Sequence, residues 1–184
     1  FLLTLSKSQS VLMSFLMETF EKIGGVPKTI VFDNMKTVMD EARTEYSKGV
    51  VNERFDQFAK DCGFDIHPCK AGRPYTKGKV EATMKLIDEI HAYQGQFSYE
   101  ELQNFVQSLC ERINHSYHQG TGKIPILAFE QEKNLLQPLP RNEIRDSYKI
   151  KHTLVKVNSA GMVTYKGNQY SVPAEYKGKT VGLQ

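Results

Sequence analysis

Two carboxylates are distinguished in this sequence by the residues around them. Asp33 ends the apolar run Thr29–Phe32, whose β-branched and aromatic residues predict a short buried strand, and Asn34 interrupts that run directly afterwards. Glu81 is the only acid between Lys70 and Lys85, a stretch that holds five Lys or Arg residues. A carboxylate at a strand end and a second one among cations suit a metal-dependent enzyme that acts on a polyanion.

Clustered carboxylates hold two divalent ions in phosphoryl-transfer nucleases and polynucleotidyl transferases. One ion activates water or a 3′-hydroxyl, and the other stabilises the leaving oxygen. Oxygen ligands of this kind select Mg²⁺ or Mn²⁺. In the alternative interpretation, Asp33 caps a turn and Glu81 pairs with Lys77 or Lys85, each four residues away on the same helical face. Spacing alone leaves both interpretations open.

The basic residues around Glu81 are candidates for contacts with phosphate groups near the scissile bond. An aromatic ring among them is suited to stacking on a base or a ribose. The alternative is an ordinary solvated charged loop. The candidate DNA-binding residues are Lys70, Arg73, Tyr75, Lys77, Lys79 and Lys85.

Charge is distributed unevenly along the 184 residues, although the net charge is only +3. Residues 141–184 carry eight Lys or Arg against three Asp or Glu, whereas residues 1–140 carry sixteen against eighteen. The lysines of the basic tail are a second candidate for DNA contacts, and ordinary surface lysines are the alternative.

Cys62, Cys69 and Cys110 match neither a disulfide framework nor a tetrahedral zinc site, so reduced thiols are expected. No run reaches the roughly 18 apolar residues of a membrane span, and no basic-then-apolar leader is present. These features predict a cytoplasmic protein without a membrane partner. Because the sequence begins at Phe1, inside an apolar stretch, we expect an upstream portion to be missing.

The order of elements predicts an α/β fold with partly parallel strands. A strand end at 1–5 is followed by a helix that Ser8 or Ser10 caps and Gly24 ends, with its buried stripe at positions 12, 15, 16, 20 and 23. The strand ending at Asp33, a loop or short exposed hairpin at 34–49, a helix at 50–62 and a strand at 64–67 come next. Alternation of strands and helices in this order favours an α/β sandwich.

The second half is predicted to be helical first and then β. After a helix at 77–93, the capping box of Ser98 and Glu101 starts an amphipathic helix, and Pro125 suits the first turn of a helix at 125–134. Residues 137–147 resemble a linker. Four strands, expected at 152–157, 162–166, 169–172 and 179–183, predict a small β-barrel-like domain whose closure is expected to need sequence beyond Gln184.

Several separated segments resemble, in the same order, the catalytic core of IstA-type insertion-sequence transposases, which belong to the integrase-like superfamily. The segment that closes many integrase cores is similar to Asn114–His118, followed by Gly122–Pro125 and Phe129-Glu130. The other matching segments are Phe32–Thr37, Phe58-Ala59, Gly63-Phe64, Cys69, Gly72–Pro74 and Lys77–Glu81.

The resemblance implies an RNase H-like core at residues 1–95 that lacks its first strands. A helical extension at 96–136, the linker at 137–147 and a β domain at 148–184 complete the expected organisation. Asp33 resembles the second acid of the family's Asp-Asp-Glu triad, and Glu81 resembles the third. The strand that carries the first acid is absent, and Asp40, Asp56, Asp61 and Asp65 lie in the wrong elements to replace it.

The function that the resemblance implies is that of a DNA transposase, which cleaves the 3′ ends of a mobile element and joins them to target DNA with Mg²⁺ or Mn²⁺. The implied partners are transposon-end and target DNA, further copies of the protein and a helper ATPase, in a bacterial, nucleoid-associated setting. Because the first acid is missing, we expect the chain alone to be inactive. The alternatives are a non-catalytic DNA-binding or regulatory relative and an RNase H-like nuclease.

Overall fold

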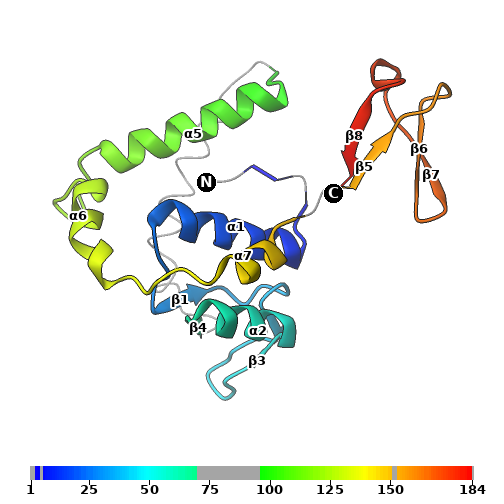
Figure 1. The fold of residues 1–184 in the computed structure, drawn as a ribbon. Helices are drawn as coiled ribbons and strands as arrows, with labels where there is room; N and C mark the ends of the chain where they lie inside the picture. Colours follow the sequence, from blue (N-terminus) through cyan, green and yellow to red (C-terminus); the bar gives the residue numbers. More distant parts are fainter. Residues whose placement is uncertain (1–2, 5, 70–95, 151–152, 184) are drawn as a thin grey trace. The chain divides into compact units, whose positions relative to one another are not determined.

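The computed structural model describes residues 3–4, 6–69, 96–150 and 153–183. The chain has a mixed α/β fold and divides into two compact units, Phe1–Tyr148 and Lys149–Gln184 (Figure 1). The elements of the first unit are, in chain order, α1 (Gln9–Ile23), β1 (Thr29–Phe32), β2 (Met39–Glu41), β3 (Val50–Val51), α2 (Glu53–Cys62), β4 (Asp65–Pro68), α5 (Tyr99–His115), α6 (Pro125–Glu132), the 3-10 turn η3 (Lys133–Leu135) and α7 (Asn142–Tyr148).

Helix α1 begins and ends at the signals predicted from the sequence, and α2 ends at its predicted glycine. The Ser8 hydroxyl accepts a hydrogen bond from the amide of Val11 at the start of α1, and the chain leaves the helix at Gly24. Asn52 caps α2 in the same way, and Gly63 ends it. The second helix therefore starts at Glu53, three residues later than expected, because Val50 and Val51 form β3.

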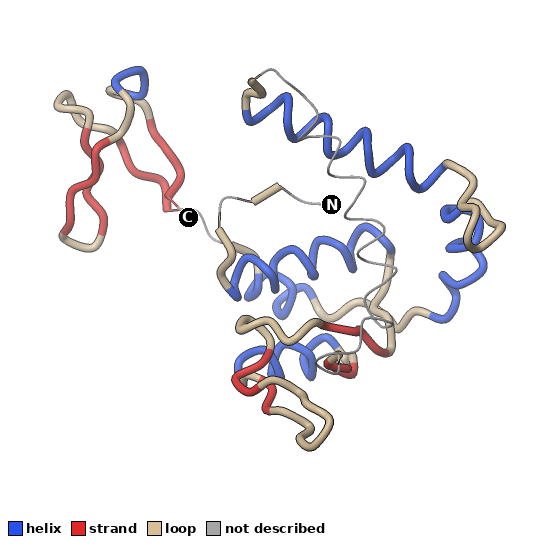
Figure 2. Tube along the Cα trace, turned by 180° about the vertical axis from the view of Figure 1, so that it is seen from behind, coloured by secondary structure: helices blue, strands red, loops and turns tan. Residues whose placement is uncertain are grey.

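Strands β1 and β4 form a parallel pair, which confirms the prediction of partly parallel strands. Thr29 lies opposite Asp65 and Phe32 lies opposite Pro68, so the carboxyl ends of the two strands lie at the same edge. Both strands have only four residues, and Figure 2 shows them as short segments among longer helices. Helix α2 precedes β4 directly and supplies much of the apolar surface that covers this pair.

The core of the first unit is a cluster of aromatic and sulfur-containing side chains. Phe32 meets Phe55 edge to face, with 5.1 Å between ring centroids, and Phe64 lies in the same cluster. The buried members are Met13, Met17, Phe20, Val26, Phe32, Val38, Met39, Phe55, Phe58, Ala59, Cys62 and Phe64. Because Phe32 is the last residue of β1, its burial in this core fixes the carboxyl end of the strand.

The buried face of α1 differs from the stripe predicted at positions 12, 15, 16, 20 and 23. Of those residues only Phe20 is buried, whereas Met13 and Met17 are almost completely inaccessible. The helix is apolar on most of its circumference, so the core that it packs against selects the face. At the N-terminus, Leu3 and Thr4 lie in no strand, and the other residues of the expected strand end lie outside the described residues.

A short hairpin spans residues 39–51, and a hairpin was one of the two structures expected for residues 34–49. Strands β2 and β3 pair in antiparallel fashion, with Met39 opposite Val51. The hairpin is attached to the core at its base, where Val38 and Met39 are buried, while Tyr46 near its tip is almost completely exposed.

Helix α5 confirms both its predicted start and its predicted apolar stripe. The Ser98 hydroxyl and the Glu101 carboxylate form the reciprocal capping box. Leu109 is buried, and the other predicted stripe residues are less exposed than the residues between them. Helix α6 begins at Pro125 as expected, although Leu127, which was expected to pack, is exposed.

The segment 137–147, expected as a linker, differs from that expectation. Gln137 forms a β-bridge with Val26, and α7 occupies Asn142–Tyr148. Arg145 of α7 makes a 3.0 Å ion pair with Glu21, and the Tyr148 ring lies 4.7 Å from that of Phe58. The prolines suggested a linker, but these long-range contacts hold the segment on the first unit.

The second unit has all four predicted strands but not the predicted barrel. Its described elements are β5 (Thr153–Lys156), β6 (Met162–Tyr165), β7 (Asn168–Ser171), the 3-10 turn η4 (Ala174–Tyr176) and β8 (Thr180–Leu183). Strand β5 pairs with β8, and β6 pairs with β7, each in antiparallel fashion. The described strands form two separate two-stranded sheets, and four-residue strands in two pairs leave edges that do not close into a barrel.

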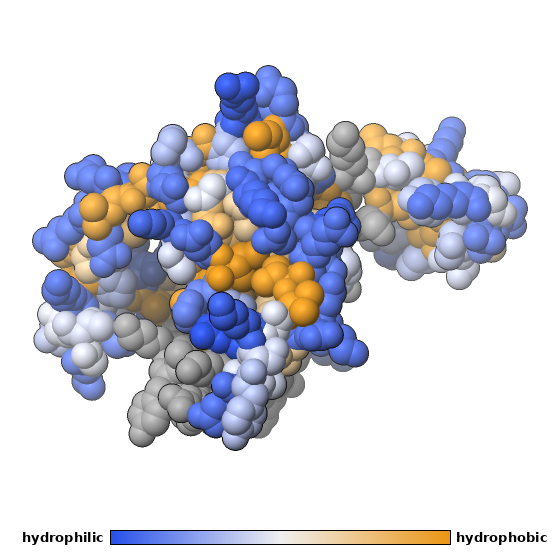
Figure 3. Space-filling model, turned by 90° about the horizontal axis from the view of Figure 1, so that it is seen from below, coloured by the Kyte–Doolittle hydropathy of each residue, from blue (hydrophilic) through white to orange (hydrophobic). Residues whose placement is uncertain are grey.

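The surface mixes hydrophilic and hydrophobic side chains, as the face in Figure 3 shows. Such scattered apolar exposure is normal for folded proteins. Among the described residues, no helix combines the length and the apolar character needed to cross a lipid bilayer.

Candidate functional site

Asp33 lies at the carboxyl end of β1, directly after the buried residue Phe32. Its side chain is half-buried, and its carbonyl oxygen accepts a 2.8 Å hydrogen bond from the amide of Met35. The Met35 carbonyl in turn accepts from the amides of Val38 and Met39, both buried. The turn that carries Asp33 is thus held between two parts of the core.

The end of β4 lies beside Asp33 because the two strands are parallel. The amide of Cys69 donates a 2.8 Å hydrogen bond to the carbonyl of Phe32, which extends the β1–β4 ladder past Pro68. The structure therefore brings Cys69, which precedes Glu81 by 12 residues in the sequence, beside the strand end that carries Asp33.

Two residues at this edge were not among the predicted site residues. The side chain of Asn34 connects the carbonyl of Cys69 with the amide of Arg43, and the Arg43 guanidinium donates to the carbonyl of Pro68. In the sequence, Asn34 is only a residue that ends a strand, and Arg43 is one of several charges in a polar segment. An Asn directly after a candidate catalytic acid is the signal that could have directed attention to it.

The remaining predicted site residues lie outside the described residues. This holds for the second candidate acid, Glu81, and for the whole predicted DNA-binding set, Lys70, Arg73, Tyr75, Lys77, Lys79 and Lys85. Their assignment stays a prediction.

Carboxylate oxygens such as those of Asp33 are the ligands that Mg²⁺ and Mn²⁺ prefer. Within the described ranges, no three His, Cys, Asp or Glu side chains gather closely enough to hold a metal ion. A metal site at this edge would therefore need Glu81 or another ligand in addition to Asp33.

The cysteines of the first unit are suited to packing. Cys62 and Cys69 are buried and Cys110 is half-buried, and none of the three is in a disulfide. Burial raises the pKa of the Cys62 thiol to about 12, and the neighbouring negative charge of Asp61 acts in the same direction. At neutral pH this thiol is protonated, which is unfavourable for a nucleophile or a metal ligand.

His115 and His118 make local hydrogen bonds near the end of α5. His115 Nδ1 lies 2.9 Å from the carbonyl oxygen of Glu111, and His118 Nδ1 lies 3.1 Å from the hydroxyl of Thr121. The His118 amide also donates to the carbonyl of Lys123. These contacts shape the turn between α5 and α6 and give both rings a structural role.

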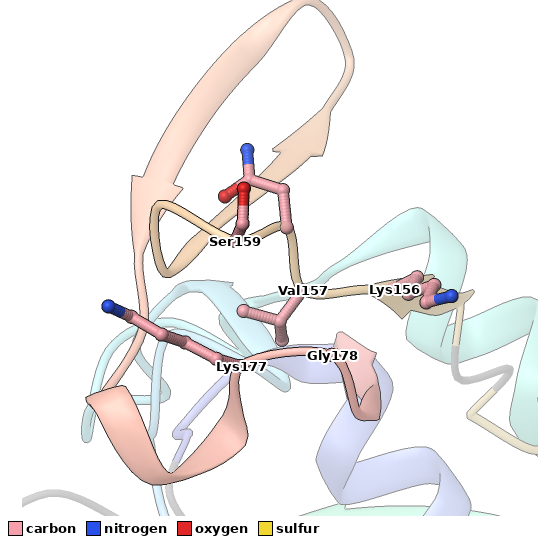
Figure 4. A pocket seen from close by; sticks show the side chains of 6 residues that line it. Lys156, Val157, Ser159, Lys177 and Gly178 are labelled. Carbon is pink, nitrogen blue, oxygen red and sulfur yellow. The ribbon is translucent and has the colours of Figure 1, made fainter.

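A shallow pocket in the second unit is lined by lysines of the basic tail. Figure 4 shows the side chains of Lys156 and Lys177 extending in opposite directions on either side of Val157. Their ammonium groups therefore do not converge on one point, as a built phosphate site would require.

Comparisons with known proteins place the sequence among bacterial transposases. The chain is 71% identical, over all of its 184 residues, to the transposase for insertion sequence element IS232 of Bacillus thuringiensis subsp. berliner, and this match covers 43% of that relative. It is 28% identical over 176 residues, 92% of the chain, to the transposase for insertion sequence element IS21 of Pseudomonas aeruginosa, again covering 43% of the relative.

A transposase for the insertion sequences IS1326/IS1353 of Shigella flexneri is 27% identical over 90% of the chain and 32% of its own length. No protein-family model matches the chain. The chain thus spans less than half the length of these curated relatives, and the similarity extends through both of its units. By its sequence the chain belongs to the insertion-sequence transposases of the IS21 type.

Proposed function

We propose that this chain is the part of an insertion-sequence transposase that carries two of its catalytic acids, Asp33 and Glu81, and that it acts in metal-dependent DNA cleavage and strand transfer. The observation that carries this proposal is the position of Asp33 at the carboxyl edge of a parallel strand pair, where the neighbouring strand is followed by Cys69, 12 residues before Glu81 in the sequence. In open α/β sheets, ligands bind at the carboxyl ends of the strands. The names of the relatives supply the substrate class.

The proposed site uses an Asp-Asp-Glu type of chemistry. Asp33 and Glu81 would each supply oxygen ligands to Mg²⁺ or Mn²⁺, and a bound ion would supply Lewis-acid activation of the attacking hydroxyl and stabilisation of the leaving oxygen. The basic side chains near Glu81 would bind the DNA backbone and orient the scissile phosphate. The turn after β1 would hold the Asp33 carboxylate in place during both steps.

The parallel β1–β4 pair with α2 before β4 is compatible with an RNase H-like core, which we propose as the fold of the complete catalytic domain. A third acid on a further strand would complete the triad, so the chain alone is expected to be inactive. A multimeric assembly on DNA and a helper ATPase belong to the same proposal, as does action at the bacterial nucleoid.

The proposal is tested by an assay of 3′-end joining in Mg²⁺ or Mn²⁺, with DNA from the ends of the parent element. The chain is compared with the complete reading frame that contains it, and Asp33→Asn and Glu81→Gln are introduced into the latter. Asp65→Asn is the matched control, because Asp65 is an exposed acid at the amino end of β4, away from the carboxyl edge.

We expect joining by the complete protein, loss of at least about 10³-fold of that activity in each acid variant, and little change in the control. Robust joining by the chain alone would refute the missing-acid argument. DNA binding without any cleavage by the complete protein would favour the non-catalytic alternative, and cleavage without joining would favour a nuclease.

A further inference from the structure

Asn34 and Arg43 connect three stretches of backbone at the edge where Asp33 lies. Asn34 Nδ2 donates to the carbonyl oxygen of Cys69 over 2.9 Å, and Asn34 Oδ1 accepts from the amide of Arg43, also over 2.9 Å. The side chain thus joins backbone atoms 35 residues ahead and 9 residues ahead of it. Arg43 adds a third connection, because its guanidinium donates to the carbonyl of Pro68 over 2.9 Å.

These contacts hold the chain on both sides of Asp33. On one side, the Phe32 ring is buried in the core and the Phe32 carbonyl accepts from the Cys69 amide over 2.8 Å. On the other side, the Asn34 side chain is fixed by both of its polar ends. Because both neighbours of Asp33 are held, the direction of its Cα–Cβ bond is held as well, which is how partners behind a ligand set its orientation.

We infer that Asn34 and Arg43 are positioning residues that orient the Asp33 carboxylate for a divalent ion. This inference rests on the proposed function, in which Asp33 is a metal ligand. Neither residue is assigned contact with the metal or the DNA. Asn34 acts through the backbone of its neighbour, and Arg43 acts through Asn34 and the end of β4.

The effect of removing the Arg43 charge distinguishes a positioning role of Arg43 from a purely electrostatic one. Arg43 is a cation near the edge where the ion would bind, so its removal should strengthen cation binding if charge alone mattered. The positioning role predicts the opposite result, because the end of β4 and the Asn34 side chain lose a support. A purely structural role would lower stability and leave the affinity of the folded protein unchanged.

The test measures Mn²⁺ binding to the chain by electron paramagnetic resonance, and stability by urea unfolding of the same samples. The variants are Asn34→Ala, Arg43→Ala and Arg43→Lys, with Asp33→Asn as the ligand variant. Gln57→Ala is the control, because the Gln57 amide bonds to Asp61 on the exposed side of α2. Hydrogen exchange of the Arg43 amide reports directly on the Asn34 contact.

We expect Asn34→Ala and Arg43→Ala to weaken Mn²⁺ binding by about 10-fold or more, the range seen when partners behind metal ligands are removed. Arg43→Lys should retain most of the affinity, since one ammonium group can replace the single bond to Pro68. The Arg43 amide should exchange faster in Asn34→Ala. If Asn34→Ala fails to fold, the pair Arg43→Ala and Arg43→Lys still decides the question.

Different results would overturn the proposed function and the positioning role. If Asp33→Asn leaves Mn²⁺ binding unchanged, or if neither the chain nor the complete reading frame binds Mn²⁺ at all, the proposed function is overturned. If Asp33→Asn abolishes binding while Asn34→Ala and Arg43→Ala keep wild-type affinity, the function stands and the positioning role is wrong. Tighter Mn²⁺ binding by Arg43→Ala would show that Arg43 acts through its charge and not by positioning Asp33.

Discussion

The Tyr148 hydroxyl donates a 2.5 Å hydrogen bond to Oδ2 of Asp61, which joins the last residue of α7 to α2. The two residues are 87 positions apart. Together with the ion pair of Arg145 and Glu21, this contact makes α7 part of the first unit. The segment 137–148 therefore ends in a helix that packs on the first unit.

Replacing Tyr148 with Phe should destabilise the first unit. The variant keeps the ring against Phe58 but removes the donor to a carboxylate, so we expect a loss of about 1.5 kcal/mol in the free energy of unfolding. Urea unfolding measures it. Tyr46→Phe is the control, because Tyr46 is 97% exposed and its loss of a hydroxyl should change nothing measurable. Equal effects in both variants would contradict the role of the contact.

Stability should fall at alkaline pH. Burial raises the pKa of the Cys62 thiol from 9.0 to about 12, and burial followed by the bond to Asp61 raises the pKa of Tyr148 above its ordinary value of 10.0. The folded state therefore binds these protons more tightly than the unfolded state does. Their contribution is complete below about pH 9 and is lost as the pH rises towards the folded values.

The measurement for this pH effect is the urea midpoint between pH 8 and pH 11. Tyr148→Phe removes one of the two groups and should flatten the decline above pH 10. A decline of unchanged steepness in that variant would show that Tyr148 does not contribute.

Gly49→Ala should disturb the hairpin that carries Arg43. Gly49 has φ of +73°, and a Cβ placed there would lie 2.6 Å from the carbonyl oxygen of Glu41 and 2.7 Å from the amide nitrogen of Arg43. Displacing these backbone atoms is energetically costly, so we expect a loss of about 3 kcal/mol in the free energy of unfolding. The control is Gly24→Ala, where φ is +82° but the nearest atom lies 3.9 Å away. A loss no larger than in the control would argue against the steric conflict.

Ser98→Ala should destabilise the start of α5. It removes the acceptor for the Glu101 amide and the hydroxyl that donates to the Glu101 carboxylate, at a cost of about 1 kcal/mol. The bonds from the Ser98 amide and hydroxyl also lower the pKa of Glu101, so this stabilisation is present at neutral pH and is lost as the pH falls through the lowered pKa. Circular dichroism at 222 nm between pH 7 and pH 2 should show an acid loss of helix in the wild type that is smaller in Ser98→Ala.

Lys77→Gln should weaken DNA binding in a salt-dependent way if Lys77 contacts phosphate. Removing one phosphate contact lowers the slope of log affinity against log salt by about 0.9 for duplex DNA. Fluorescence anisotropy at about 50 to 300 mM KCl measures the affinity from which this slope is obtained. Lys60→Gln is the control, because Lys60 is paired with Asp56 at 2.6 Å on α2. Identical slopes for wild type and Lys77→Gln would remove Lys77 from the DNA-binding set.

The local signals of the sequence predicted most of the described helices and strands, with α7 and β3 as exceptions. The cap at Ser8, the capping box at Ser98 and the glycine after α2 mark helix ends because they satisfy backbone groups within a few residues. The stripe of α5 was correct because its opposite face is strongly polar, so only one orientation buries apolar surface.

Structural features that depend on contacts between distant residues could not be predicted from local sequence signals. The sequence of α1 is apolar on several sides, so periodicity could not show that Met13 and Met17 would be buried. The prolines at 138 and 140 suggested a linker, and the contacts of Tyr148 and Arg145 that hold α7 lie 87 and 124 residues away along the chain. The C-terminal strands were located correctly, but their pairing into two sheets is non-local.

The sequence by itself determined the family, the two candidate acids and the limits of most described elements, because these depend on residue type and short-range order. Only the tertiary structure placed the end of β1 beside Cys69 and showed that the side chains of Asn34 and Arg43 bond to the backbone at the end of β4. Parallel pairing brings the ends of β1 and β4 together, and a side-chain hydrogen bond to a backbone group 35 residues away leaves no periodic pattern in the sequence. The Asp33 edge thus acquires its support from contacts that exist only in the folded chain.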